Sequence, residues 1–261
     1  CIDKEKSELY IRLFAQEATD GENDDIVLVN YNAMEREELS KIAQSSEALS
    51  ISNDGQVWSY LRDNNIYISG KNFANGILVL EGSANEVYLR PYGMVGDSVI
   101  YESYSHIYPE KNGIGVINAS KSKNIFINVE QPNYLGYNEQ TNEIYYTQKS
   151  TNDKIKAVNV DTQKRRDVIS LTTEVDEFVS NYYISPDFKY IAYIGYLDQI
   201  GMTKASLKVY DMTSKEVVFI YDFENIDNIT DVIFENDNVY VVQNGKFSKI
   251  DVIIEEEQSK I

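Results

Sequence analysis

The chain contains 261 residues with 42 acidic and 24 basic side chains, which gives a formal net charge of −18. Hydrophobic residues make up 43% of the sequence and charged residues 25%, a composition typical of a folded chain and not of a disordered or collagen-like one. The acidic balance argues against nucleic-acid binding and against docking on anionic lipid through charge, because both need clustered Lys and Arg.

The numbering begins at Cys1, which is the only cysteine and has no Met before it. In this position it resembles the first residue of a mature bacterial lipoprotein, whose signal peptide is removed before a cysteine that carries a diacylglycerol. A tag remnant or an artificial end is the alternative origin. The resemblance implies lipid attachment at Cys1, a polar tether over residues 1–7, and a lipid-anchored location on the extracytoplasmic face of a bacterial membrane. No apolar run reaches about 18 residues, so we expect no membrane-spanning helix.

Carboxylates cluster at several places along the chain. Residues 20–25 combine Asp, Asn and Glu, whose oxygens suit Ca²⁺, but they lack the spacing of an EF-hand. Adjacent pairs such as Glu37 and Glu38 do not establish the separation that a glycosidase needs. We therefore expect a solvated acidic surface, with no metal site and no cofactor.

Strand patterns dominate the chain from its beginning to its end. Short runs of apolar, β-branched and aromatic residues are separated by Asn, Asp, Gly and Ser, which is typical of strands joined by turns. The clearest runs are Ile26–Val29, Asn65–Ile68, Ile77–Leu80, Asn124–Ile127, Glu143–Tyr146, Val217–Ile220 and Val239–Val242.

These runs recur at a regular spacing. A strand that ends in a small or polar residue, followed by a polar turn and another strand, ends near positions 30, 118, 159 and 210, and weaker copies end near positions 69 and 250. The gaps are 39, 49, 41, 51 and 40 residues, a period typical of a β-propeller with about four strands in each blade. The sequence therefore predicts an all-β fold in which residues 8–261 form one propeller domain of six blades, with seven blades as the alternative.

The middle of the chain offers little catalytic chemistry. His106 is the only histidine, so ordinary zinc ligation is excluded and a Ser-His-Asp triad would have to use it. The chain has no G-x-S-x-G elbow, no Walker A loop and no dinucleotide-binding glycine motif. We interpret Gly113-Ile114-Gly115 as a hairpin turn. We expect His106 to be a structural or surface residue, and we predict no catalytic residues and no enzymatic activity.

Two hairpins in the second half carry a family resemblance. Ile184-Ser185-Pro186-Asp187-Phe188-Lys189-Tyr190-Ile191-Ala192-Tyr193 and Leu207–Glu216 resemble paired hairpins of TolB-like and YVTN-like bacterial propellers. The match covers about 45 residues well and the other blades loosely. Phe188 replaces the usual turn glycine, so we predict that this turn is not the tight glycine type. The resemblance implies a propeller that acts mostly in binding and assembly.

Tyrosine is abundant, with 21 residues in the chain. Six tyrosines near predicted strand ends are candidates for an aromatic binding face, because surface Tyr is enriched at protein and carbohydrate interfaces. They are Tyr101, Tyr104, Tyr108, Tyr134, Tyr137 and Tyr196. The alternative is that Tyr is simply common in strands.

Three functions remain open from the sequence, and one of them, a cytoplasmic scaffold, depends on Cys1 being an artificial start of the chain. The first is a lipid-anchored extracytoplasmic propeller that binds a membrane-associated protein as a non-catalytic accessory subunit of an envelope complex. The second is a propeller that binds or acts on carbohydrate through surface Tyr and carboxylates, with a glycan as its ligand. The sequence identifies no ligand-binding residue for any of the three functions.

Overall fold

The computed structural model describes residues 2–3, 8–13, 25–30, 35–39, 48–52, 55–70, 75–83, 86–148, 151–170, 177–199, 202–223, 229–235, 238–243 and 246–250. Almost all of these residues lie in β-strands, as the apolar runs predict. Two compact units divide the chain, residues 1–132 and residues 133–261. Each unit is described by itself below.

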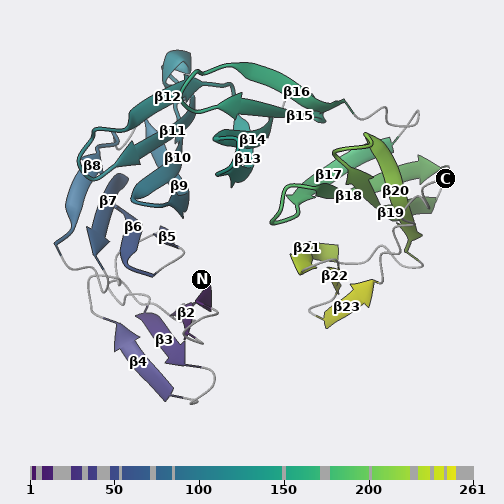
Figure 1. Ribbon diagram of the computed structural model, residues 1–261, viewed down its shortest axis with the longest axis horizontal. Helices are drawn as coiled ribbons and strands as arrows, with labels where there is room; N and C mark the ends of the chain where they lie inside the picture. Colours follow the sequence, from purple (N-terminus) through teal and green to yellow (C-terminus); the bar gives the residue numbers. More distant parts are fainter. Residues whose placement is uncertain are drawn as a thin grey trace, which may run out of the picture. The chain divides into compact units, whose positions relative to one another are not determined.

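The first unit contains three four-stranded antiparallel sheets, and each strand runs beside the one that follows it in the chain (Figure 1). The strands of these sheets are β1 (Ile2–Asp3), β2 (Glu8–Leu13), β3 (Asp25–Asn30), β4 (Glu35–Leu39), β5 (Ala48–Ile51), β6 (Val57–Arg62), β7 (Asn65–Gly70), β8 (Ile77–Leu80), β9 (Tyr88–Val95), β10 (Ser98–Tyr104), β11 (Gly113–Asn118) and β12 (Asn124–Asn128). A single 3-10 turn, η3 (Pro109–Lys111), lies between β10 and β11.

The second unit continues the same arrangement, with two four-stranded sheets and a sheet of three described strands. Its strands are β13 (Pro132–Asn138), β14 (Glu143–Gln148), β15 (Thr151–Asn159), β16 (Arg165–Ser170), β17 (Glu177–Ile184), β18 (Tyr190–Gln199), β19 (Met202–Asp211), β20 (Glu216–Asp222), β21 (Ile229–Glu235), β22 (Asn238–Gln243) and β23 (Lys246–Ile250).

The predicted repeat is confirmed strand by strand. Each of the six repeat positions lies within one residue of the end of the third strand of its sheet, in β3, β7, β11, β15, β19 and β23. The described strands thus form six sheets, one for each repeat. The number of blades in the complete fold stays a prediction, as does the division into residues 1–7 and 8–261. Ile2 and Asp3 pair with Leu9 and Glu8 in the first sheet.

A shared turn joins the third and fourth strands of three sheets. Lys121, Gln163 and Lys215 all have left-handed backbone, with φ of 56°, 55° and 62°. Each donates its N–H to the carbonyl of a residue at the end of the third strand, namely Asn118, Asn159 or Asp211. The side chains of these three residues also accept hydrogen bonds from within the turn, as Asn and Asp commonly do.

The hydrophobic core lies between neighbouring sheets. One cluster joins β6 and β7 to β9, β10 and β11, with Ile66, Val99 and Ile117 almost completely buried. A second joins β14–β16 to β17 and β18, and a third joins β18 and β19 to β22 and β23. Buried apolar side chains on facing sheets therefore stabilise each unit through sheet-on-sheet packing.

The two glycines Gly113 and Gly115 lie inside β11, and this corrects their interpretation as a hairpin turn. Gly115 pairs with Tyr101 on β10, and the Tyr101 ring occupies the space that a side chain at residue 115 would need. Burial of this ring raises the pKa of the Tyr101 hydroxyl to about 12. The glycine is thus required by close packing of an aromatic ring against the strand.

The turn at Phe188 also differs from the prediction. Phe188 has φ of 58°, the left-handed conformation that a turn glycine would provide, and its N–H donates to the Ser185 carbonyl at 2.9 Å. Its ring lies 5.2 Å from the Tyr145 ring, measured between centroids, and would lie 3.3 Å from a Cβ atom at Gly136 on the preceding sheet. Contact between sheets therefore offsets the strain of a left-handed phenylalanine.

Candidate binding groove

The outer strand β20 presents apolar side chains to solvent. Among the strands that the structure describes, it pairs with β19 alone, and it carries five consecutive apolar residues, 217–221. Val217 is 40% exposed, Ile220 59% and Tyr221 43%. Exposed apolar groups on an edge strand mark an interaction site or an aggregation hazard, because the free backbone edge can pair with another chain.

An aromatic groove runs beside this strand. Its volume is about 230 Å³, and it is lined by Phe219, Tyr221 and Phe223 on one side and by Val241, Gln243, Ser248, Lys249 and Ile250 of β22 and β23 on the other. Tyr221 and Phe223 make an edge-to-face contact at 5.2 Å. Val241 and Ile250 are buried and belong to the core between the two sheets, so the groove has a firm apolar floor. We call it the β20 groove.

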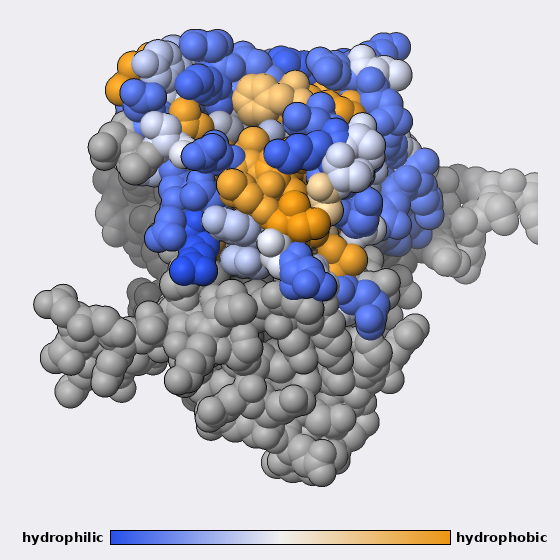
Figure 2. All heavy atoms as spheres, turned by 90° about the vertical axis from the view of Figure 1, so that its left-hand side faces the viewer, coloured by the Kyte–Doolittle hydropathy of each residue, from blue (hydrophilic) through white to orange (hydrophobic). Residues whose placement is uncertain are grey.

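The other described outer strands expose different kinds of side chains. In β16 the exposed residues Arg165, Arg166 and Asp167 are charged, and β12 begins and ends in exposed Asn residues. The short strand β8 is apolar, with Ile77 48% and Leu78 39% exposed. Figure 2 shows the side of the molecule on which β8 lies, where an apolar patch is surrounded by hydrophilic residues. β20 combines such side chains with an adjacent groove.

Not all six candidate tyrosines are exposed enough to contribute to a binding face. Tyr101 is buried, and burial also raises the pKa of Tyr134 to about 12. Tyr137 is half-buried and donates a hydrogen bond to Asn142. Tyr104 and Tyr108 lie in the first unit, whereas Tyr196 lies in β18 of the second. The aromatic residues that do line a groove, Phe219, Tyr221 and Phe223, are different ones.

His106 lies in an ordered, exposed loop between β10 and β11. Its Nδ1 is 2.9 Å from the Tyr104 hydroxyl. Ser105 is 2% exposed and its Oγ accepts hydrogen bonds from the N–H groups of Ile107 and Tyr108, so it shapes the loop. Neither residue is arranged as a nucleophile with its base. The interpretation of His106 as a structural or surface residue stays a prediction.

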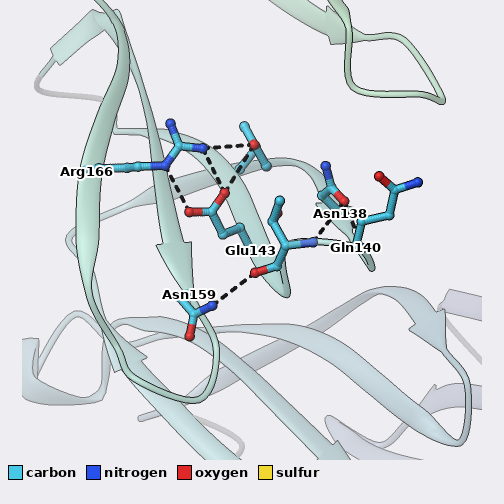
Figure 3. A network of polar contacts seen from close by, with 7 residues as sticks. Asn138, Gln140, Glu143, Asn159 and Arg166 are labelled. Atoms are coloured by element: carbon cyan, nitrogen blue, oxygen red, sulfur yellow. Dashed lines mark hydrogen bonds and ion pairs between the residues drawn. The ribbon is translucent and has the colours of Figure 1, made fainter.

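A polar network crosses one face of the β13–β16 sheet (Figure 3). Arg166 on β16 makes a bidentate ion pair with Glu143 on β14, with N–O distances of 2.9 and 2.7 Å, and also donates to the Tyr145 hydroxyl. The Arg166 hydrogen bond, opposed by burial, lowers the pKa of Glu143. Asn159 holds the neighbouring turn by donating to the Thr141 carbonyl. The network joins β14 to β16 and to the neighbouring turn, so its geometry indicates stabilisation of the sheet.

This ion pair predicts an acid-sensitive contribution to stability. Because the pKa of Glu143 is lowered on folding, the contribution is present above the ordinary carboxyl pKa and is lost as pH falls through the folded value. The Arg166→Gln variant should lose about 1 kcal/mol at neutral pH and show a shallower loss of stability on acidification. Urea unfolding at neutral and acidic pH measures both effects. Arg62→Gln is the control, because Arg62 is equally exposed and its contact with Asp63 is 3.6 Å long. An unchanged acid slope in Arg166→Gln would contradict the prediction.

Several sequence-based candidates lie outside the described residues. Cys1 is one of them, and so are residues 20–24 of the acidic cluster. Within the ranges that the structure describes, no three His, Cys, Asp or Glu residues are grouped closely enough to hold a metal ion. No helix in the same ranges is long and apolar enough to cross a membrane.

The β20 groove was not recognised in the sequence, although a signal was present. The run Val217–Ile220 indicates a strand, and its place after the repeat position at 210 makes that strand the outermost of its sheet. An outer strand with an uninterrupted apolar centre is unusual, because edges are normally protected by charge. The aromatic residue at position 223 and the facing residues of β22 and β23 could not be assigned to the groove without the packing of the two sheets.

No protein-family model matches this sequence, and no curated protein matches it significantly. Solved structures do resemble it. An oligogalacturonate lyase in complex with manganese aligns with a TM-score of 0.65 at 14% identity, over 93% of this chain and 69% of the lyase. A prolyl endopeptidase aligns with a TM-score of 0.65 at 8% identity, over 96% of this chain but only 41% of the endopeptidase. Hydrazine synthase of Kuenenia stuttgartiensis gives a TM-score of 0.57 at 12% identity, covering 94% of this chain and 72% of the other.

These similar structures are propeller-like folds. The chain has a β-propeller fold. The prediction made from the repeat is thereby confirmed at the level of fold class, while identities this low carry no residue of an active site across to this propeller.

The prediction that the chain has no enzymatic activity, which rested on its missing catalytic motifs, is wrong. Proteins with similar folds include a lyase and a prolyl endopeptidase. Similar propellers therefore occur in enzymes, and the missing motifs do not establish that this chain lacks activity. The shortage of His and Cys restricts the kinds of catalytic chemistry that the chain could use, but it does not show that this propeller lacks catalytic activity.

Proposed function

We propose that this β-propeller binds a protein partner in the β20 groove and belongs to a complex in the bacterial cell envelope. The observation that carries the proposal is the groove itself, in which three aromatic side chains lie over a buried apolar floor beside an exposed strand. Buried aromatic anchors dominate the binding energy of protein interfaces.

Lipid attachment at Cys1 is the second part of the proposal. It is supported by the identity and position of this residue and by the polar residues that follow it. A tether of about seven residues reaches at most roughly 25 Å, so the partner would have to lie at the membrane. The net charge of −18 would speed association with a basic partner and would disfavour acidic ones.

The test uses the natural gene product isolated from native membranes, with Cys1→Ala and Tyr221→Ser as variants. Tyr88→Ser is the matched control, because Tyr88 is 46% exposed on β9 and Tyr221 is 43% exposed on β20. We expect a lipid mass on Cys1. We also expect one stoichiometric partner that is retained by the wild type and by Tyr88→Ser, and that binds at least about tenfold more weakly to Tyr221→Ser.

Each part can fail separately. An unmodified Cys1 would overturn the anchor. A partner retained equally by Tyr221→Ser and Tyr88→Ser would overturn the groove as its binding site, and the absence of any stoichiometric partner would overturn the proposed function.

A further inference from the structure

We propose that the partner binds by adding an extended segment to the free edge of β20, and that this segment is apolar at its centre and basic at both ends. This inference rests on the proposed function of the β20 groove and specifies the chemistry of the partner. It follows from three features of β20, namely its backbone edge, the direction of its side chains and the charges at its ends.

The backbone edge of β20 carries no second strand among the described residues, and a β-bulge at Val218 is its one irregularity in the pairing with β19. That pairing runs from Glu216 to Asp222. The outward N–H and C=O groups of such an edge can bond to an incoming strand, which is how β-augmentation provides affinity. Neither proline nor a charged residue interrupts residues 217–221.

The directions of the β20 side chains indicate that a strand added to β20 would lie over the groove. Phe219 is opposite Val209 in β19, and Tyr221 is opposite Leu207, which are both buried. Directly paired residues lie on the same face of a sheet, so Phe219 and Tyr221 face the core side and the groove. Ile220 is opposite Lys208 and lies on the other face. Every second side chain of an added strand would therefore rest on the groove, which requires a centre with alternating apolar residues.

The ends of β20 determine the charge of the occupant. Glu216 and Asp222 are exposed carboxylates that bracket the apolar centre. An incoming strand with Lys or Arg near both ends would place opposite charges side by side, which stabilises cross-strand pairs, whereas acidic ends would be repelled.

The same charges argue against a second copy of this chain. Two β20 strands paired antiparallel about Phe219 would bring Glu216 of one copy opposite Asp222 of the other at both ends. Like charges directly opposite are destabilising, and each copy also carries a net charge of −18. A basic partner segment has neither disadvantage.

The test measures binding of synthetic peptides to the full chain by calorimetry. The probe alternates valine with threonine between lysine ends. One comparison peptide has glutamate ends. Two further peptides are N-methylated on alternate amides, one along each edge of the extended peptide, so that one of them is methylated on the edge that pairs with β20. Hydrogen exchange over Glu216–Asp222 reports where the peptide binds.

We expect the lysine-ended probe to slow amide exchange in β20. We expect at least about tenfold weaker binding for the glutamate-ended peptide and for the peptide methylated on the pairing edge. The double variant Glu216→Gln, Asp222→Asn should lose most of the discrimination between lysine and glutamate ends. The Tyr221→Ser variant should bind the probe more weakly, whereas Tyr88→Ser should bind it normally.

Three results would overturn the inference. The first is equal binding of the methylated and unmethylated peptides. The second is slow amide exchange of β20 in the free chain, which would mean that residues beyond Ile250 cover the edge. The third is a dimer, detected by sedimentation, in which β20 is protected from exchange. The two proposals fail differently. A Tyr221-dependent membrane partner together with equal peptide binding would leave the proposed function standing without strand addition. Peptide protection of β20 without any membrane partner would contradict the proposed function and leave the edge as a strand acceptor.

Discussion

Replacing Trp58 with alanine should lower the free energy of unfolding by about 3–5 kcal/mol, the range typical of a large aromatic side chain removed from a core. Trp58 is completely buried in β6, and its indole N–H donates to the Gly55 carbonyl at 3.0 Å. The substitution creates a cavity and leaves that carbonyl without its partner. Because Trp58 is the only tryptophan in the chain, unfolding in urea should be followed by circular dichroism.

Two variants make this result interpretable. Trp58→Phe should lose less stability, because it keeps most of the apolar volume and removes only the indole hydrogen bond. Tyr88→Ala, which removes a 46% exposed aromatic side chain from β9, should change stability by no more than about 0.5 kcal/mol. Equal losses in Trp58→Ala and Tyr88→Ala would show that Trp58 does not stabilise the first unit.

The second large effect is expected at Gly115. A Cβ atom there would overlap the Tyr101 ring, and both residues lie in the interior of the β9–β12 sheet. The ring cannot move away easily because Tyr101 is 3% exposed. Gly115→Ala should therefore destabilise the protein by about 2–3 kcal/mol, the usual cost of overpacking a core.

Gly93→Ala is the matched control for this substitution. Gly93 lies in β9 of the same sheet, and nothing stands within 4 Å of the position that its Cβ would occupy. It should change stability little. In the double variant Tyr101→Leu, Gly115→Ala, the added methyl should be less destabilising than it is beside Tyr101, because the ring that it overlaps is gone. If Gly115→Ala lowered the free energy of unfolding as much in the Tyr101→Leu background as in the wild type, the proposed contact would be contradicted.

The strands were predictable because their signal is local. Ile26–Val29, Asn65–Ile68 and Glu143–Tyr146 lie in β3, β7 and β14 as expected. The repeat was predictable for a related reason, since Asn118, Asn159 and Asp211 end strands and hold turns through their own side chains. Short-range hydrogen bonding of this kind depends on neighbouring residues and can be recognised in a sequence.

The remainder depends on contacts between distant segments. Phe188 adopts the left-handed conformation because its ring packs against Tyr145, more than 40 residues earlier in the chain. The need for glycine at residue 115 also depends on a distant contact, because it arises from the Tyr101 ring on the neighbouring strand. The β20 groove joins side chains from β20, β22 and β23, so no single segment shows it. Tyr101, selected because it lies near a strand end, is buried, which its position in the sequence does not indicate.

The shared turn of β11–β12, β15–β16 and β19–β20 has a consequence for how such a chain can change in length. Its left-handed residue and its Asn or Asp lie within one hairpin, and each described core cluster joins neighbouring sheets only. A genetic duplication or deletion of one repeat would therefore preserve every turn and replace one sheet-to-sheet contact with another of the same kind. Propellers built in this way can diverge in size by whole sheets while single residues inside each hairpin stay constrained.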